Sequence, residues 1–132
     1  MQSKLRTLCT LLLLSWSMST PALAQDKNDG LSVSDLKTYL QYATALNCQP
    51  RAEGDSLYAS LSRSGNAFAV LIEKTSGGSL GKTKFNPQQA RNFFSNELAI
   101  QMLKACPNRL STSERSNIQA MQAELLKRKN SR

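Results

Sequence analysis

The chain has 132 residues, of which 17 are lysine or arginine, nine are aspartate or glutamate and none is histidine. This length allows one domain, and the lack of histidine excludes histidine-dependent catalytic triads and most catalytic zinc sites. The formal net charge is +8, but six of the basic residues lie at the two ends of the chain. Residues 25–126 carry eleven basic and nine acidic residues, and this nearly balanced body lacks the basic face that nucleic-acid binding needs.

Residues 1–24 have the pattern of a secretory signal peptide. A positively charged start precedes an apolar core over residues 8–14, and Ala22 and Ala24 are the small residues that a signal peptidase accepts before its cleavage point. The apolar run is too short for a membrane-spanning helix, so we expect a mature chain that begins at Gln25 and is not an integral membrane protein. Such a chain is expected in the periplasm, or else in the thylakoid lumen or secreted.

The mature chain is expected to begin with a disordered segment, residues 25–31, and then to form a single helical domain over residues 32–126. The first helix is predicted to start at Ser32, because Ser32 and Asp35 have the spacing of a capping box. Apolar residues then recur with a helical period as far as Cys48, where the helix is expected to end.

The segment 56–74 permits two interpretations. Its apolar residues fit one face of a helix, which we expect to be interrupted near Gly65 because glycine weakens a helix interior by about 1 kcal/mol. The alternative is a β-hairpin in which residues 64–66 turn the chain and residues 68–72 form a buried strand, which would give an α+β fold. An isolated hairpin between helices is marginally stable, so the helix is the preferred prediction. A flexible, glycine-rich loop over residues 76–81 is expected to follow.

Two further helices are predicted from their starting residues. Asn86 is a good N-cap, with proline at the first helical position and Gln89 at the capping-box spacing. The broad apolar face of this helix marks it as the central helix of the core, and a Cys-Pro pair at Cys106 ends it. The last helix opens with the capping box from Ser111 to Glu114, and its narrow apolar stripe is typical of a helix on the surface of a bundle.

The chain ends in a basic tail, residues 127–132. The simplest interpretation is a solvated helix end, because basic side chains complement the negative end of a helix dipole. The alternative is a weak electrostatic contact between the tail and an anionic surface. The tail carries Lys127, Arg128, Lys129 and Arg132.

Two of the three cysteines, Cys48 and Cys106, remain after cleavage, and an exported chain keeps such a pair oxidised. In the chain-entropy model, a disulfide between them would stabilise the fold by about 4 kcal/mol. The sequence gives no support for a redox or metal-binding role of the pair, because it has no CxxC spacing and no histidine. The sequence therefore predicts an all-α fold, a small bundle of about four helices with one disulfide.

No constellation in the sequence predicts catalytic, cofactor-binding or metal-binding residues. Residues 77–83 look like a phosphate-binding loop, but Ser76 stands where that loop needs glycine, and no helix is expected to start at Lys82. Among the scattered acids, only Glu53 and Asp55 lie close together, in a turn where water would keep both ionised. We therefore expect no catalytic residue, no cofactor and no metal.

Residues 73–107 carry a set of short motifs: Gly77-Gly78, Gly81, Thr83-Lys84, a helix start at Gln88-Gln89 and a final Cys106-Pro107. With these motifs the chain resembles a family of small exported cyanobacterial proteins that has no settled function. The resemblance implies a helical exported domain with a cysteine pair, located in the periplasm or the thylakoid lumen. It implies no catalytic residue.

From these observations we expect a small exported, non-enzymatic module that binds a protein or assists an assembly of the cell envelope. The candidate partner surface consists of Tyr39, Tyr42 and Phe68, which would act through an exposed apolar groove. The alternative is an exported enzyme or enzyme inhibitor that uses the glycine-rich loop, residues 76–84, as its contact surface. A deep polar pocket that holds Glu53, Asp55 or Glu73 would favour the enzyme.

Overall fold

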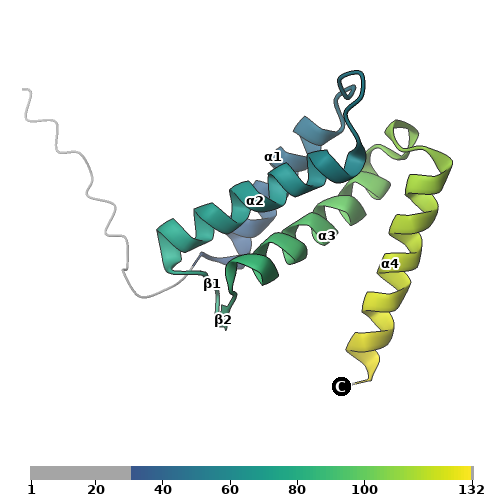
Figure 1. Cartoon of the computed structure of the whole chain (residues 1–132). Helices are drawn as coiled ribbons and strands as arrows, with labels where there is room; N and C mark the ends of the chain where they lie inside the picture. Colours follow the sequence, from purple (N-terminus) through teal and green to yellow (C-terminus); the bar gives the residue numbers. More distant parts are fainter. Residues whose placement is uncertain (1–30, 132) are drawn as a thin grey trace, which may run out of the picture.

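The computed structural model describes residues 31–131 and shows four helices joined by short connections (Figure 1). The predicted all-α bundle with one disulfide is confirmed. The predicted signal peptide and residues 25–30 lie outside the described residues. The elements, in chain order, are α1 Val33–Asn47, α2 Leu57–Ser76, β1 Ser79–Leu80, β2 Thr83–Lys84, α3 Pro87–Ala105, the 3-10 turn η1 Pro107–Arg109 and α4 Thr112–Asn130.

The predicted helix starts are confirmed by their hydrogen bonds. In each of three capping boxes, the N-cap side chain accepts from the backbone N–H three residues later, and that residue's side chain accepts from the N-cap backbone. Each box satisfies two backbone donors of the kind that a helix start leaves without intrahelical partners. The three boxes are Ser32 with Asp35, Asn86 with Gln89, and Ser111 with Glu114.

Residues 56–74 belong to α2 and its N-cap, so the hairpin alternative is wrong, and the expected interruption at Gly65 is wrong as well. Gly65 is buried where α2 packs on α3, and a β-carbon there would lie 2.3 Å from Ser95 Oγ and 2.8 Å from the Arg91 carbonyl oxygen. The Ser95 hydroxyl also donates to the Leu61 carbonyl at 3.0 Å. Glycine therefore serves the close approach of two helices here, and it does not break the helix.

The glycine-rich segment 76–81, expected to be a flexible loop, is ordered: it contains the end of α2 and the first strand of a short hairpin. Gly77 has a φ of 59° and stops α2, and Gly81 has a φ of 56° at the first turn position between β1 and β2. Leu31 forms a parallel bridge with Leu80, so the last residue of the segment expected to be disordered is ordered. Burial of Leu80 in the core explains why this short hairpin is held against the bundle.

The core is built around α3, which packs against α1, α2 and α4, as expected for a central helix. Leu98 and Met102 of α3 are almost completely buried. From α2, Ile72 is equally buried, and Phe68 stacks on Phe94 with the ring centroids 4.3 Å apart. The α2–α3 pair is therefore the main packing unit of the protein.

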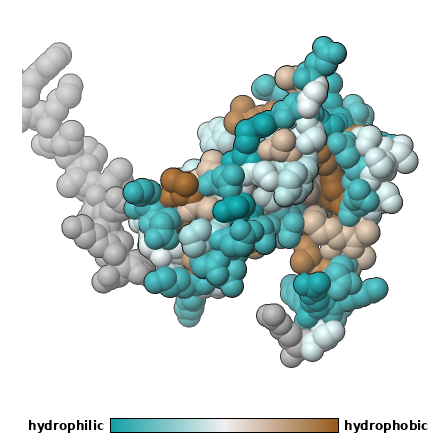
Figure 2. Space-filling model, in the orientation of Figure 1, coloured by the Kyte–Doolittle hydropathy of each residue, from teal (hydrophilic) through white to brown (hydrophobic). Residues whose placement is uncertain are grey.

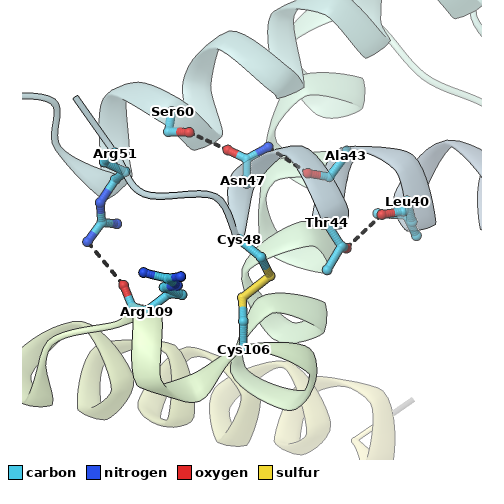
Figure 3. Close-up of a disulfide and its surroundings, with 9 residues drawn as sticks. All are labelled: Leu40, Ala43, Thr44, Asn47, Cys48, Arg51, Ser60, Cys106 and Arg109. Atoms are coloured by element: carbon cyan, nitrogen blue, oxygen red, sulfur yellow. Dashed lines mark hydrogen bonds between the residues drawn. A yellow bond between two sulfur atoms is a disulfide. The ribbon is translucent and has the colours of Figure 1, made fainter.

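The disulfide joins the C-terminal ends of α1 and α3 (Figure 3). The Cα atoms of Cys48 and Cys106 are 5.9 Å apart, within the ordinary range for a disulfide. Beside it, the Asn47 side chain accepts a hydrogen bond from the Ser60 hydroxyl and donates to Ser64 Oγ at 3.1 Å. These two hydrogen bonds tie the end of α1 to α2, and the disulfide ties it to the end of α3.

The last helix leaves the bundle (Figure 1). Ile118 is buried at 5% exposure, whereas Leu126, two turns further along α4, is 55% exposed. The helix continues to Asn130, so residues 127–130 are its last turn and no separate tail begins at Lys127; basic side chains are favourable at that end of a helix. Between residues 31 and 131, no helix combines the length and apolar character needed to cross a membrane.

Candidate functional site

The predicted partner surface does not form a single patch. Tyr42 is 70% exposed and Tyr39 is 36% exposed, both on α1, whereas Phe68 is only 3% exposed. The apolar face of α2 that carries Phe68 is the face that packs on α3, where Phe68 stacks on Phe94. Phe68 is therefore a core residue, and its place in the predicted surface is wrong.

A cleft of about 530 Å³ lies between α4 and the α2–α3 pair. It forms because α4 packs on α3 near the connection through η1 and then diverges from it, which gives the two helices a V shape (Figure 1). Figure 2 shows apolar side chains gathered along the gap between α4 and the body of the bundle. We call this space the α4 cleft.

The α4 cleft has an apolar floor that is continuous with the core. Leu57, Ala99 and Ile118 are buried core residues that also line the cleft. On the diverging half of α4, Met121 lines the cleft and is only half-buried, and Leu125 follows one turn later, also half-buried. Both side chains touch the core at one side, so the apolar stripe of α4 extends beyond the part that the bundle fully buries.

The rim of the α4 cleft is polar and mostly uncharged. Its side-chain amides each provide donors and an acceptor, and Gln88 Nε2 donates to Asn92 Oδ1 at 2.8 Å. These residues were not predicted from the sequence, although polar residues recur at three- and four-residue spacing on α3, which is the signal of one polar helix face. The rim amides are Asn66, Gln88, Asn92, Asn96 and Asn117.

The wall of this cleft contains a cationic side chain, Arg91 of α3. One of the hydrogen-bond donors of Arg91 has no partner in the described part of the chain. Its Nε atom is buried and has no hydrogen-bond partner among residues 31–131. Arg91 also lines an adjoining smaller hollow of about 290 Å³, together with Val70 and Glu73. Arg91 therefore lies where the two hollows meet.

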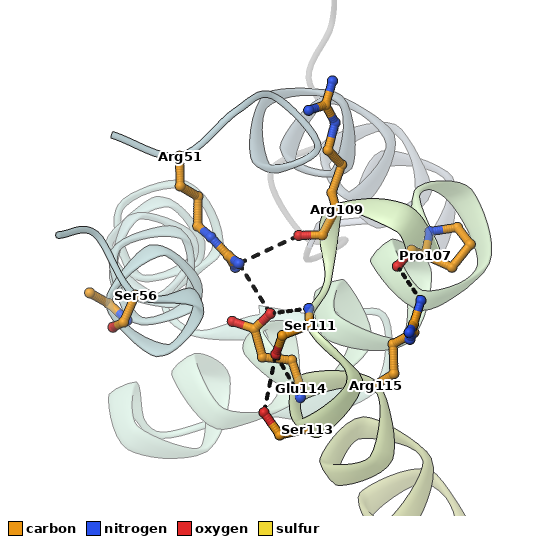
Figure 4. A network of polar contacts seen from close by, with 9 residues as sticks. Arg51, Ser56, Pro107, Arg109, Ser111, Ser113, Glu114 and Arg115 are labelled. Atoms are coloured by element: carbon orange, nitrogen blue, oxygen red, sulfur yellow. Dashed lines mark hydrogen bonds and ion pairs between the residues drawn. The ribbon is translucent and has the colours of Figure 1, made fainter. Parts of the chain in front are cut away.

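A network of polar contacts closes the narrow end of the α4 cleft (Figure 4). The Arg51 guanidinium contacts Glu114 at 3.1 Å and donates to the Arg109 carbonyl at 3.4 Å. Burial by itself raises the pKa of Glu114, but the hydrogen bonds from the Ser111 backbone and from Arg51 outweigh it, so the pKa lies below its ordinary value. Glu114 is thus an ionised residue that holds α4 in place.

Glu53, Asp55 and Glu73, the acidic residues whose presence in a deep polar pocket would favour an enzyme, do not line the α4 cleft. Glu53 is exposed in the loop before α2, and Asp55 pairs with Arg63. Glu73 is exposed at the edge of the smaller hollow. The loop of residues 76–84, which the enzyme or inhibitor alternative uses, does not line the α4 cleft.

A second groove, of about 580 Å³, runs between α1 and α3 beside the disulfide. Its walls are mainly apolar, including Leu36, Leu40 and Cys48. It has fewer polar side chains than the α4 cleft and contains no buried donor without a partner among the described residues. The α4 cleft is the better candidate site because it combines an apolar floor, an amide rim and Arg91.

The fold and the cleft together define a small, disulfide-linked helical domain with an open binding cleft. Comparisons with protein-family models, with curated proteins and with solved structures found no match for the chain.

Proposed function

We propose that this protein is a small exported, non-enzymatic accessory module of the cell envelope that binds a protein partner in the α4 cleft. The observation that supports this most directly is the composition of the cleft, with an apolar floor beneath a rim of neutral amides. Burial of apolar surface provides roughly 25 cal/mol per Å² removed from water, and the amides can pair with polar groups of the partner.

The disulfide between Cys48 and Cys106 supports the exported location, because such bonds persist in oxidising compartments. The signal peptide predicted over residues 1–24 would bring the chain there. We propose the periplasm as the compartment. The same signal peptide is also compatible with the thylakoid lumen or with secretion.

Site-specific photo-crosslinking tests the proposal in the cells that make the protein. We would replace Tyr58, which lines the α4 cleft and is 79% exposed, by p-benzoylphenylalanine in the full chain. The matched control is the same replacement of Tyr42, which is 70% exposed on α1 away from the cleft. We expect a discrete protein adduct from position 58 and none of that size from position 42. Equal adducts from both positions, or none from either, would contradict the proposal.

A further inference from the structure

We propose that the occupant of the α4 cleft is an amphipathic helix of the partner protein, and that a carboxylate on this helix pairs with Arg91. The inference rests on the proposed function, because it specifies the chemistry of the partner at the same site.

Arg91 has a hydrogen-bond donor that the protein leaves unsatisfied among the described residues. Three other arginines of the described chain, Arg51, Arg63 and Arg128, each contact a carboxylate of the protein itself. Arg91 has no such partner among residues 31–131, as is also true of Arg109 and Arg115, and its Nε atom is buried without an acceptor. The other buried donor without a partner in this part of the chain, Nη1 of Arg51, belongs to a guanidinium that is already paired with Glu114. A buried donor without a partner is costly, so an acceptor brought by a ligand gains this free energy. A carboxylate matches the guanidinium best, because it can accept two parallel hydrogen bonds.

The α4 cleft also has a shape and an apolar pattern that suit a helix. Ile118, Met121 and Leu125 follow each other on one face of α4, but the bundle buries only the first of them. From the opposite wall, the half-buried Leu61 of α2 lines the same cleft. A helix laid between these walls would cover the exposed part of the stripe, which is the usual way in which a groove binds an amphipathic helix.

The charged side chains around the α4 cleft also favour an acidic partner. The last turn of α4, at the open end of the V, carries Lys127, Arg128 and Lys129, and Arg91 lies in the wall of the cleft. The carboxylate inside the cleft, Glu114, is paired with Arg51. Arg128 is paired with Glu124, so among the described residues Arg91, Lys127 and Lys129 provide the positive charge around the cleft that has no carboxylate partner. This charge attracts an acidic helix and disfavours a basic one. A second copy of α4 is disfavoured for this reason, because its own last turn is basic.

A lipid with an anionic head could also present an acceptor to Arg91. It would leave the five amides of the rim without protein groups to pair with, whereas a helix brings polar side chains to both edges of the groove. The observations therefore favour the helix, and the lipid becomes one outcome of the test.

The test selects ligands for the full, disulfide-bonded chain from a displayed library of helical peptides. Each peptide has about five turns, with a fixed apolar stripe and randomised polar positions. We expect enrichment of aspartate or glutamate at one position beside the stripe. The affinity of the selected peptides should fall about tenfold or more with Arg91→Met, recover in part with Arg91→Lys, and stay unchanged with the control Arg63→Met. Arg63 is exposed on α2 and does not line the cleft.

Circular dichroism and thermal unfolding of each variant would establish that the fold is retained, and Arg91→Gln is a second variant should Arg91→Met unfold. Selected peptides without an acidic preference, equal affinity for wild type and Arg91→Met, or no selected peptide at all would overturn the inference. So would binding of oleate that depends on Arg91 in the absence of peptide binding.

The crosslinking experiment separates this inference from the proposed function. A protein adduct at position 58 that Arg91→Met leaves unchanged would overturn the role of Arg91 and keep the cleft as the binding site. Loss of the adduct with Arg91→Met, but not with Arg63→Met, would support both.

Discussion

Gly65 of α2 lies so close to Ser95 of α3 that a β-carbon at Gly65 would come within 2.3 Å of the Ser95 hydroxyl oxygen. The Arg91 carbonyl oxygen would be 2.8 Å away, and a backbone atom cannot withdraw without moving α3. This contact determines how closely α2 and α3 approach each other. Because Arg91 and Ser95 also line the α4 cleft, the same contact positions the wall of the candidate site.

The substitution Gly65→Ala should therefore destabilise the protein, although alanine stabilises an ordinary helix interior by about 1 kcal/mol relative to glycine. Overpacking at this crossing is expected to lower the free energy of unfolding by about 1–3 kcal/mol, measured by urea denaturation. Ala67→Gly, at an exposed position of the same helix, is the control and should cost about 1 kcal/mol from helix propensity alone. A stabilised Gly65→Ala variant would show that the helices do not pack as closely as described.

Loss of the disulfide should have the largest effect on stability of the changes considered. Cys48→Ser is expected to lower the free energy of unfolding by about 2–5 kcal/mol, because the bond closes a long loop between residues that are 58 apart in sequence. Cys106→Ser and the double variant should cost about the same, since each removes the same bond. Reaction of both cysteines with a maleimide in the folded, oxidised protein would contradict the bond.

The charge of Glu114 should make stability depend on pH in acid. Because the pKa of Glu114 is lowered in the folded protein, its contribution is present above the ordinary glutamate value of about 4.3 and is lost as the pH falls through the folded value. Glu114→Gln keeps a residue that suits the capping box but removes the charge paired with Arg51. We expect it to cost about 1 kcal/mol at neutral pH, and the difference from wild type should vanish in acid.

Denaturation at a series of pH values checks this. The control is Glu124→Gln, which breaks the exposed pair with Arg128 and should change stability by less than about 0.5 kcal/mol. A constant difference between wild type and Glu114→Gln across the acid range would show that the charge of Glu114 contributes nothing.

Export should remove the first 24 residues. We expect N-terminal sequencing and intact mass of the protein from its own cells to give a chain that begins at Gln25, because Ala22 and Ala24 precede that position in the pattern of a signal peptidase site. Ala24→Arg is the control and should leave an uncleaved chain. Recovery of the full-length wild-type chain from the cytoplasm as the main species would contradict the prediction.

The starts of the helices could be predicted from the sequence because the interactions that form them are local. The three capping boxes join residues only three positions apart, and the hydrogen bonds within each box do not depend on the rest of the fold. The pairing of Cys48 with Cys106 was also predictable, because only these two cysteines follow the predicted cleavage site. These features required no knowledge of how the helices cross.

The tertiary structure decided what those helices present to each other and to solvent. The local sequence predicts that Gly65 interrupts a helix, and only the position of α3 shows that Gly65 is a contact point between two helices. The aromatic ring of Phe68 is a core group because Phe94, far along the chain, covers it. The α4 cleft arises from the divergence of α4, which packs on the bundle through Ile118 and through the bond between Arg51 and Glu114. Arg91, with its unsatisfied donor, lies in the wall of that cleft. Contacts between distant residues depend on the relative placement of whole helices, and the periodicity of a single helix does not contain that information.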